Sequence, residues 1–171
     1  MTATPSPRTI AMTVFGDLDE TRMAGMPKGR TPVATFLADA ANTAWVERTW
    51  TRAAEEIAAG HRVYVVCPRI DASDTVADAE EEDARPLASV EEVATYLRSH
   101  PALAGLAIHE LTGRTPTALK AQIMEDFSAG RAPLLVATTV IEVGVDVPEA
   151  TLMVILDAQQ FGLAQLHQLR G

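Results

Sequence analysis

The feature that most constrains the fold is a continuous apolar run at residues 134–137, within the stretch PLLVATTVIEVGVDVP. A short run without apolar–polar alternation is typical of a strand that is buried on both faces, as in a parallel sheet, although its periodicity also fits a buried helix. Gly144 gives the backbone freedom to turn after it. In an open α/β sheet, Thr138, Thr139 and Asp146 would then lie beyond the carboxyl end of the strand, where ligands bind.

Strand-like and helix-like patterns alternate along the rest of the chain. Alternation of this kind predicts the α/β class, with a mostly parallel sheet, helices on both faces and right-handed crossovers. The length of 171 residues fits one domain with a real core. The predicted strands are residues 32–38, 62–67, 103–109, 134–137 and 152–156, and the predicted helices begin near residues 43, 89, 116 and 165.

The spacing of apolar residues defines the buried faces of the predicted helices. Ser89 and Glu92 form a capping box that begins the second helix. Trp45 and Trp50 both lie on the first helix, where a tryptophan is more often part of the core than a surface for stacking bases. The inner faces are Val46, Trp50, Ala53, Ala54 and Ile57 on the first helix, Val90, Val93, Ala94 and Leu97 on the second, and Leu119, Ile123 and Phe127 on the third.

The net charge of -9 argues against a simple nucleic-acid-binding domain, which is normally basic. The acids are unevenly placed, because seven of the 23 lie between residues 71 and 83. The other 16 acids face 14 basic residues, so the remaining surface can still carry a basic stripe. Residues 71–84 are predicted to form a solvated acidic insert, and they lack the ligand spacing of a calcium loop.

Cysteine use and hydropathy indicate the compartment. The single cysteine, Cys67, rules out an internal disulfide and suits a reducing cytoplasm. Its place at the end of a predicted strand favours a small buried residue over a nucleophile. No apolar run approaches the roughly 20 residues that span a bilayer, and no secretory signal begins the chain. His61, His100 and His167 show no metal-ligand spacing. The expectation is a cytoplasmic protein with no membrane partner and no metal site of its own.

Four stretches together resemble the motifs of one protein family. TTVIEVGVDVP at residues 138–148 and ATLMVILDAQQFGLAQLHQLRG at residues 150–171 resemble motif V and the beginning of motif VI of RecG-type DNA helicases. These are superfamily-two motors that remodel branched DNA in recombination and repair. TATPSPRT at residues 2–9 resembles their motif III, and VYVVCP at residues 63–68 resembles motif IV. The similarity runs from end to end and in order.

Two alternatives accompany this resemblance. The motor of transcription-repair coupling factors is closely similar, but the sequences GDLD at residues 16–19 and VIEVGVD at residues 140–146 favour RecG. The other alternative is a non-enzymatic module that binds DNA or a helicase through the acidic insert. The RecG resemblance implies a stub of the first motor lobe and a linker at residues 1–30, followed by the second, three-layer RecA-like lobe at residues 31–171.

The resemblance also implies roles for individual residues. Thr138 and Thr139 would contact a DNA backbone, although residues of this type can equally cap a helix or loop. Gly144, Asp146 and Gln168 would face the nucleotide. His109 corresponds to a strand-end position that is often followed by glycine in the family, whereas here Glu110 follows. The implied motif III residues are Thr2, Ala3 and Thr4.

The chemistry of ATP hydrolysis is incomplete in this sequence. No G-x-x-x-x-G-K-[ST] phosphate loop occurs, and Ala158 follows Asp157 where the family pattern has a second acid. Asp157 is therefore interpreted as a strand-end residue. Both arginine-finger positions of motif VI would fall beyond Gly171, and Arg170 occupies a variable position. The intact parent is expected to use ATP and Mg²⁺, branched DNA and a first motor lobe, whereas this chain alone is expected to be inactive and to bind neither cofactor tightly.

Overall fold

The computed structural model describes residues 33–71, 88–138 and 147–170. The chain divides into two units, Ala38–Gln160 and a smaller one formed by Met1–Leu37 with Phe161–Gly171. Among the described helices, none is long and apolar enough to cross a bilayer. Several predictions fall outside the described ranges: those on Thr2, Ala3, Thr4, Thr139, Gly144, Asp146, the boundary at residue 30 and residues 72–84 of the acidic insert.

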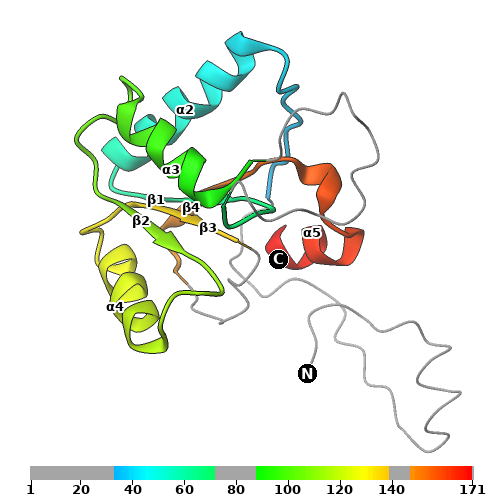
Figure 1. Ribbon diagram of the computed structural model, residues 1–171. Helices are drawn as coiled ribbons and strands as arrows, with labels where there is room; N and C mark the ends of the chain where they lie inside the picture. The colour runs from blue at the N-terminus through cyan, green and yellow to red at the C-terminus, as the bar shows by residue number, and fades with distance from the viewer. Residues whose placement is uncertain (1–32, 72–87, 139–146, 171) are drawn as a thin grey trace, which may run out of the picture. The chain divides into compact units, whose positions relative to one another are not determined.

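The larger unit is built on a parallel sheet, as the sequence predicts. In the described residues four strands are hydrogen-bonded in the order β2-β3-β1-β4, and every neighbouring pair is parallel (Figure 1). The two central strands are the most buried, as is expected where both faces of a strand are covered. The strands are β1 (Arg62–Val66), β2 (Ile108–Leu111), β3 (Leu134–Ala137) and β4 (Ala150–Ile155).

Helices cover both faces of this sheet. Helices α2 (Thr43–Ala58) and α3 (Val90–Ser99) lie on one side, and α4 (Thr117–Ser128) lies on the other (Figure 1). Strand β1 shows how the layers separate: Val63 and Val65 pack with α2 and α3, while Tyr64 packs with α4, where its ring centroid lies 4.5 Å from that of Phe127. The three-layer α/β prediction is confirmed.

Local signals in the sequence place the helix starts. The Ser89 hydroxyl donates to Glu92 Oε2 at 2.6 Å, and Ser89 Oγ accepts from the Glu92 backbone N–H at 3.3 Å. The capping box therefore forms, and Ser89 is fully buried. Asn42 caps α2 by accepting from the Trp45 backbone N–H at 3.3 Å. The remaining elements are the short 3-10 helix η1 (Ala158–Gln160) and, in the smaller unit, α5 (Leu163–Arg170).

Two predicted strands differ from the structure. Residues 33–38 form no strand, and Phe36 and Leu37 are each 87% exposed. A strand needs a neighbour to satisfy its backbone groups, and local propensity cannot supply one. The strand predicted at residues 103–109 is instead β2, Ile108–Leu111. Leu103 lies in the turns before β2 and is fully buried there. Its apolar side chain therefore indicates burial and not strand structure.

Two predicted core positions are also wrong. Trp50 is 3% exposed and belongs to the core, as predicted, but Trp45 is 52% exposed. Ile123 and Phe127 of α4 are buried, whereas Leu119 is 49% exposed. Both exposed residues lie in the first turn of a helix, and in α2 the next residue, Val46, packs against the core. Trp45 lies outside the predicted inner face of α2, whose residues all belong to the core or pack against it.

Candidate functional site

All four strands are parallel, so their carboxyl ends meet at one edge of the sheet. Such an edge is where open α/β sheets bind ligands. The residues that follow the strands there are Cys67 after β1, Thr112 after β2, Thr138 after β3 and, one residue further on, Asp157 after β4. We call this set of strand ends and their connections the carboxyl edge.

Thr138 is the predicted DNA-contacting residue that the structure describes. Its backbone N–H donates to the Leu111 carbonyl at 3.2 Å, which continues the β2–β3 ladder by one residue. The side chain is buried, and its Oγ1 has no hydrogen-bond partner in the part of the chain that the structure describes. A hydroxyl that caps a loop or helix would have one. A buried hydroxyl without a partner costs free energy, so Thr138 is a candidate for contact with a group outside the described residues.

A tight turn, which the sequence analysis missed, follows β2 at the same edge. The Thr112 N–H donates to Thr115 Oγ1 at 3.0 Å, and the Arg114 N–H donates to Thr112 Oγ1 at 3.2 Å. The two threonines therefore hold the backbone on both sides of Arg114. The signal was present, because threonine side chains close turns of this kind. The strand predicted at residues 103–109 ends before this turn, whereas β2 continues to Leu111 and leads directly into it.

The connection between β1 and α3 lies at this edge too. The carbonyls of Arg69 and Ile70 accept from the first two N–H groups of α3, those of Val90 at 3.0 Å and Glu91 at 3.3 Å. These bonds fix the backbone immediately before Asp71. The Asp71 carboxylate forms an ion pair with the Arg114 guanidinium. This pair joins the connections that follow the two strands flanking β3, the strand that leads to Thr138.

Asp157 has a structural role at the end of β4. Its backbone φ of 47° lies in the left-handed region, which aspartate tolerates better than most residues. Its Oδ2 accepts from the Ala88 N–H at 2.7 Å, and its side chain is buried. Burial, and secondarily the charge of Asp157, raises the pKa of the Cys67 thiol to about 12. Cys67 is therefore no nucleophile, and Asp157 fits its interpretation as a strand-end residue.

Gln168 is the remaining predicted site residue that the structure describes. Gln168 lies on an exposed part of α5, in the smaller unit. Helix α5 begins with a contact from the Gly162 N–H to Gln165 Oε1 at 3.0 Å. Within the described ranges there is no group of three or more His, Cys, Asp and Glu side chains placed to hold a metal ion.

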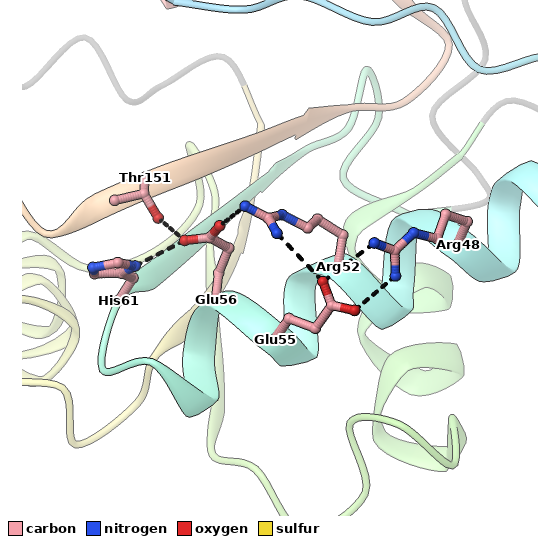
Figure 2. A network of polar contacts seen from close by, with 6 residues as sticks. All are labelled: Arg48, Arg52, Glu55, Glu56, His61 and Thr151. Atoms are coloured by element: carbon pink, nitrogen blue, oxygen red, sulfur yellow. Dashed lines mark hydrogen bonds and ion pairs between the residues drawn. The ribbon is translucent and has the colours of Figure 1, made fainter. Parts of the chain in front are cut away.

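The opposite, amino edge of the sheet carries extensive polar networks. On α2, Arg52 pairs with Glu55 and Glu56, and Glu56 also binds two residues from other elements (Figure 2). His61 Nδ1 lies 2.8 Å from Glu56 Oε2, and the Thr151 hydroxyl of β4 donates to the same oxygen at 2.6 Å. The hydrogen bond from Thr151, then that from His61, lowers the pKa of Glu56, and the charge of Arg52 adds to this.

A second network joins β2 to α4 and places His109 elsewhere than expected. His109 Nε2 lies 3.1 Å from Asp126 Oδ2, and Arg131 Nε donates to Asp126 Oδ1 at 2.7 Å. The Arg131 contact, then the His109 contact, lowers the pKa of Asp126. His109 is the second residue of β2, so the strand-end position belongs to Thr112 and the strand-end role implied for His109 is wrong.

Arg62 completes the amino edge by closing the end of α4. Its Nε donates to the Phe127 carbonyl at 3.0 Å and its Nη2 to the Ser128 carbonyl at 3.2 Å, while Nη1 binds the Gly60 carbonyl. The Phe127 and Ser128 carbonyls belong to the last turn of α4, where the Phe127 carbonyl also accepts from the Gly130 N–H at 3.0 Å. A cation at this end of a helix suits the helix dipole. Gly130 follows with φ of 76°, and a Cβ at that position would lie 2.7 Å from Arg62 Nη2.

Comparison with known proteins finds similarity along the whole chain. The family model described as helicase conserved C-terminal domain matches residues 48–171. The ATP-dependent DNA helicase RecG of Mycobacterium tuberculosis is 49% identical over 175 residues, a match that covers all of this chain and 23% of the relative. RecG of Aquifex aeolicus is 42% identical over 171 residues, covering all of this chain and 20% of the relative. The chain thus spans less than a quarter of these relatives.

A solved structure, described as RecG bound to a three-way DNA junction, is similar in fold as well as in sequence. It matches 98% of this chain with a TM-score of 0.70 and 35% sequence identity, and the match covers 20% of the longer chain. At this identity the agreement extends beyond a shared general fold.

Proposed function

The chain belongs to the family of helicase conserved C-terminal domains, in its RecG-type branch, and from this premise we propose that it serves as the second motor lobe of an ATP-dependent helicase acting on branched DNA. The observation that carries the proposal is the match along 98% of the chain to RecG bound to a three-way DNA junction. The processing of forks and junctions in recombination and repair is the biological role that fits such a lobe.

ATP chemistry in this proposal is divided between two lobes. The phosphate loop that the sequence lacks would come from a first motor lobe, and ATP with Mg²⁺ would supply the free energy for movement on DNA. This chain would contribute groups that face the nucleotide, for which the family pattern nominates Gly144, Asp146 and Gln168. Their task is to hold and orient, because none of the three can replace a phosphate loop.

DNA in this proposal lies along the carboxyl edge. Thr138 and Thr139 contact the sugar–phosphate backbone, and the Thr112–Thr115 turn adds the guanidinium of Arg114. Contacts of this kind fix position and carry no sequence information, as suits a protein that reads branch structure. The Thr138 hydroxyl is buried and lacks a partner in the described residues, so if its side chain turns toward DNA, the new hydrogen bond would remove the cost of an unmade one.

Binding of the full chain to a labelled three-way junction, measured by fluorescence anisotropy, tests the proposal. We expect weak binding that falls steeply with salt concentration. Arg114→Gln is expected to weaken it several-fold. The matched control is Arg131→Gln, which removes an arginine of similar exposure at the amino edge and is expected to leave DNA affinity unchanged.

Two results would contradict the proposal. Equal losses in the two variants would show that binding follows net charge and not the carboxyl edge. Phosphate release from ATP by the purified chain, stimulated by junction DNA, would show that catalysis is not divided between lobes.

A further inference from the structure

We propose that Asp71, in the β1–α3 connection, competes with DNA for Arg114. The carboxylate of Asp71 would thereby weaken the binding of DNA to the carboxyl edge of the lobe. This inference rests on the proposed function, and it concerns how strongly the carboxyl edge binds DNA. The bound state exchanges one anion for another: the Asp71 carboxylate leaves the guanidinium and a backbone phosphate takes its place.

The position of the ion pair supports the exchange. Arg114 comes from the turn after β2, and Asp71 comes from the connection after β1. Strand β3 lies between those two strands, and Thr138 follows it. The pair therefore connects the two sides of the strand end at which DNA is proposed to bind. A phosphate that approaches Thr138 meets a guanidinium already bound to a carboxylate.

Both partners are held on fixed backbone. Two hydroxyls hold the turn that carries Arg114. Thr112 Oγ1 accepts a hydrogen bond from the Arg114 N–H at 3.2 Å, and Thr115 Oγ1 accepts one from the Thr112 N–H at 3.0 Å. The hydrogen bonds of Arg69 and Ile70 to the start of α3 hold the chain before Asp71. The long arginine side chain is thus the part that changes partners, while its backbone and that of Asp71 stay in place.

The chemistry of the pair makes the exchange easy. The Arg114 side chain is 59% exposed and the Asp71 side chain 22%, so water competes chiefly for the guanidinium, and ion pairs near the surface contribute little net free energy. A guanidinium presents the same fork of N–H donors to a carboxylate and to a phosphate. Asp71 is also the first of seven acids within residues 71–83, so the competing charge lies at the start of an acidic stretch of sequence.

The experiment compares Asp71→Asn with the wild-type chain in binding to the labelled three-way junction. We expect about two- to fivefold tighter binding at low salt, the range that an exposed ion pair would withhold. The control is Glu125→Gln, which removes an exposed acid paired with Arg131 at the amino edge and is expected to have no effect.

The double variant Asp71→Asn with Arg114→Gln decides whether the gain passes through Arg114. We expect it to bind as weakly as Arg114→Gln alone. A gain that persists in the double variant, an equal gain in Glu125→Gln, or no gain in Asp71→Asn would each overturn the inference. If Arg114→Gln weakens binding while Asp71→Asn is neutral, the DNA-binding edge stands and only the competition fails. If no form of the chain binds the junction, both fail. Thermal melting of each variant verifies folding.

Discussion

The two edges of the sheet differ in how completely their polar groups are satisfied. At the amino edge, Glu56 has three partners from side chains, and Arg62 binds three backbone carbonyls. At the carboxyl edge, the Thr138 hydroxyl is buried without a partner in the described residues, and Asp157 holds a left-handed backbone conformation. Both edges are extensively bonded, and among the described residues of the two edges the carboxyl edge holds a buried threonine hydroxyl without a partner.

The difference separates stability from function within one lobe. Satisfied networks tie each helix to the sheet, as Arg62 does for α4 and Thr151 does for α2. Unsatisfied or strained groups persist only where the surrounding structure holds them, and they concentrate at binding sites. Substitutions at the amino edge should therefore lower stability, whereas substitutions at the carboxyl edge should change DNA binding at little cost in stability.

The largest effect is expected from Arg62→Ala. The change leaves the carbonyls of Phe127 and Ser128 without their charged donor, and hydrogen bonds to charged groups contribute about 1.5–3 kcal/mol. We expect a loss of about 2–3 kcal/mol in the free energy of unfolding, measured by urea denaturation. Arg62→Lys is the control: it keeps the charge near the helix end but cannot reach three carbonyls at once, so its loss should be smaller. Equal losses would mean that charge alone matters.

A smaller effect is expected from Gly130→Ala. An alanine there has to adopt φ of 76°, and its Cβ would displace the Arg62 guanidinium from 2.7 Å. Gly105→Ala is a matched control, since Gly105 has φ of 82° but nothing within 4 Å of the added carbon. We expect about 1 kcal/mol for the control and about 1 kcal/mol more for Gly130→Ala. Equal values in thermal denaturation would show that the Arg62 contact contributes nothing.

Thr138 and Thr151 are expected to respond differently to the same change to valine. Thr138→Val removes a buried hydroxyl that has no partner in the described residues, so we expect a gain of about 1 kcal/mol in stability together with weaker DNA binding. Thr151→Val, the same change at the amino edge, removes a hydroxyl bound to Glu56 and should cost about 0.5 kcal/mol without changing DNA binding. A stability loss in both variants would remove the distinction between the edges.

The cost of Thr151→Val should depend on pH. The Thr151 hydrogen bond is the largest cause that lowers the pKa of Glu56 below its ordinary value of 4.5. A carboxyl whose pKa is lowered by folding stabilises the protein above its ordinary pKa, and this contribution is lost as pH falls through the folded value. The difference in the free energy of unfolding between Thr151→Val and the wild type should therefore be full at neutral pH. It should vanish when the pH falls below the lowered pKa of Glu56. A difference that stays constant with pH would contradict this account.

The sequence predicted elements well where burial and local capping agree. The run at residues 134–137 is β3, a central strand buried on both faces. The Ser89–Glu92 capping box begins α3, and the apolar spacing on α2 and α3 identifies their inner faces. The RecA-like lobe that the motifs implied is confirmed by its similarity to RecG in sequence and structure. The roles of Thr138, Thr139, Gly144, Asp146 and Gln168 stay predictions.

Prediction failed where a residue's environment depends on distant neighbours. Residues 33–38 have strand-like composition but no strand forms there. His109 follows an apolar run, yet it lies inside β2 because that strand continues to Leu111. Trp45 shares the helix of Trp50 but is half exposed. In each case the local pattern is compatible with more than one environment, and tertiary neighbours decide which one forms.

By itself the sequence determined the alternation of strands and helices, the buried central strand and the family, because periodicity and motif order are properties of neighbours along the chain. Only the tertiary structure decided which polar groups are satisfied. Arg62 reaches α4 across 65 residues of sequence, and Arg114 reaches Asp71 across 43. Partners at such distances are chosen by the packing of parallel strands, and that packing left one edge of the sheet bonded and the other with an unpaired hydroxyl among the residues described.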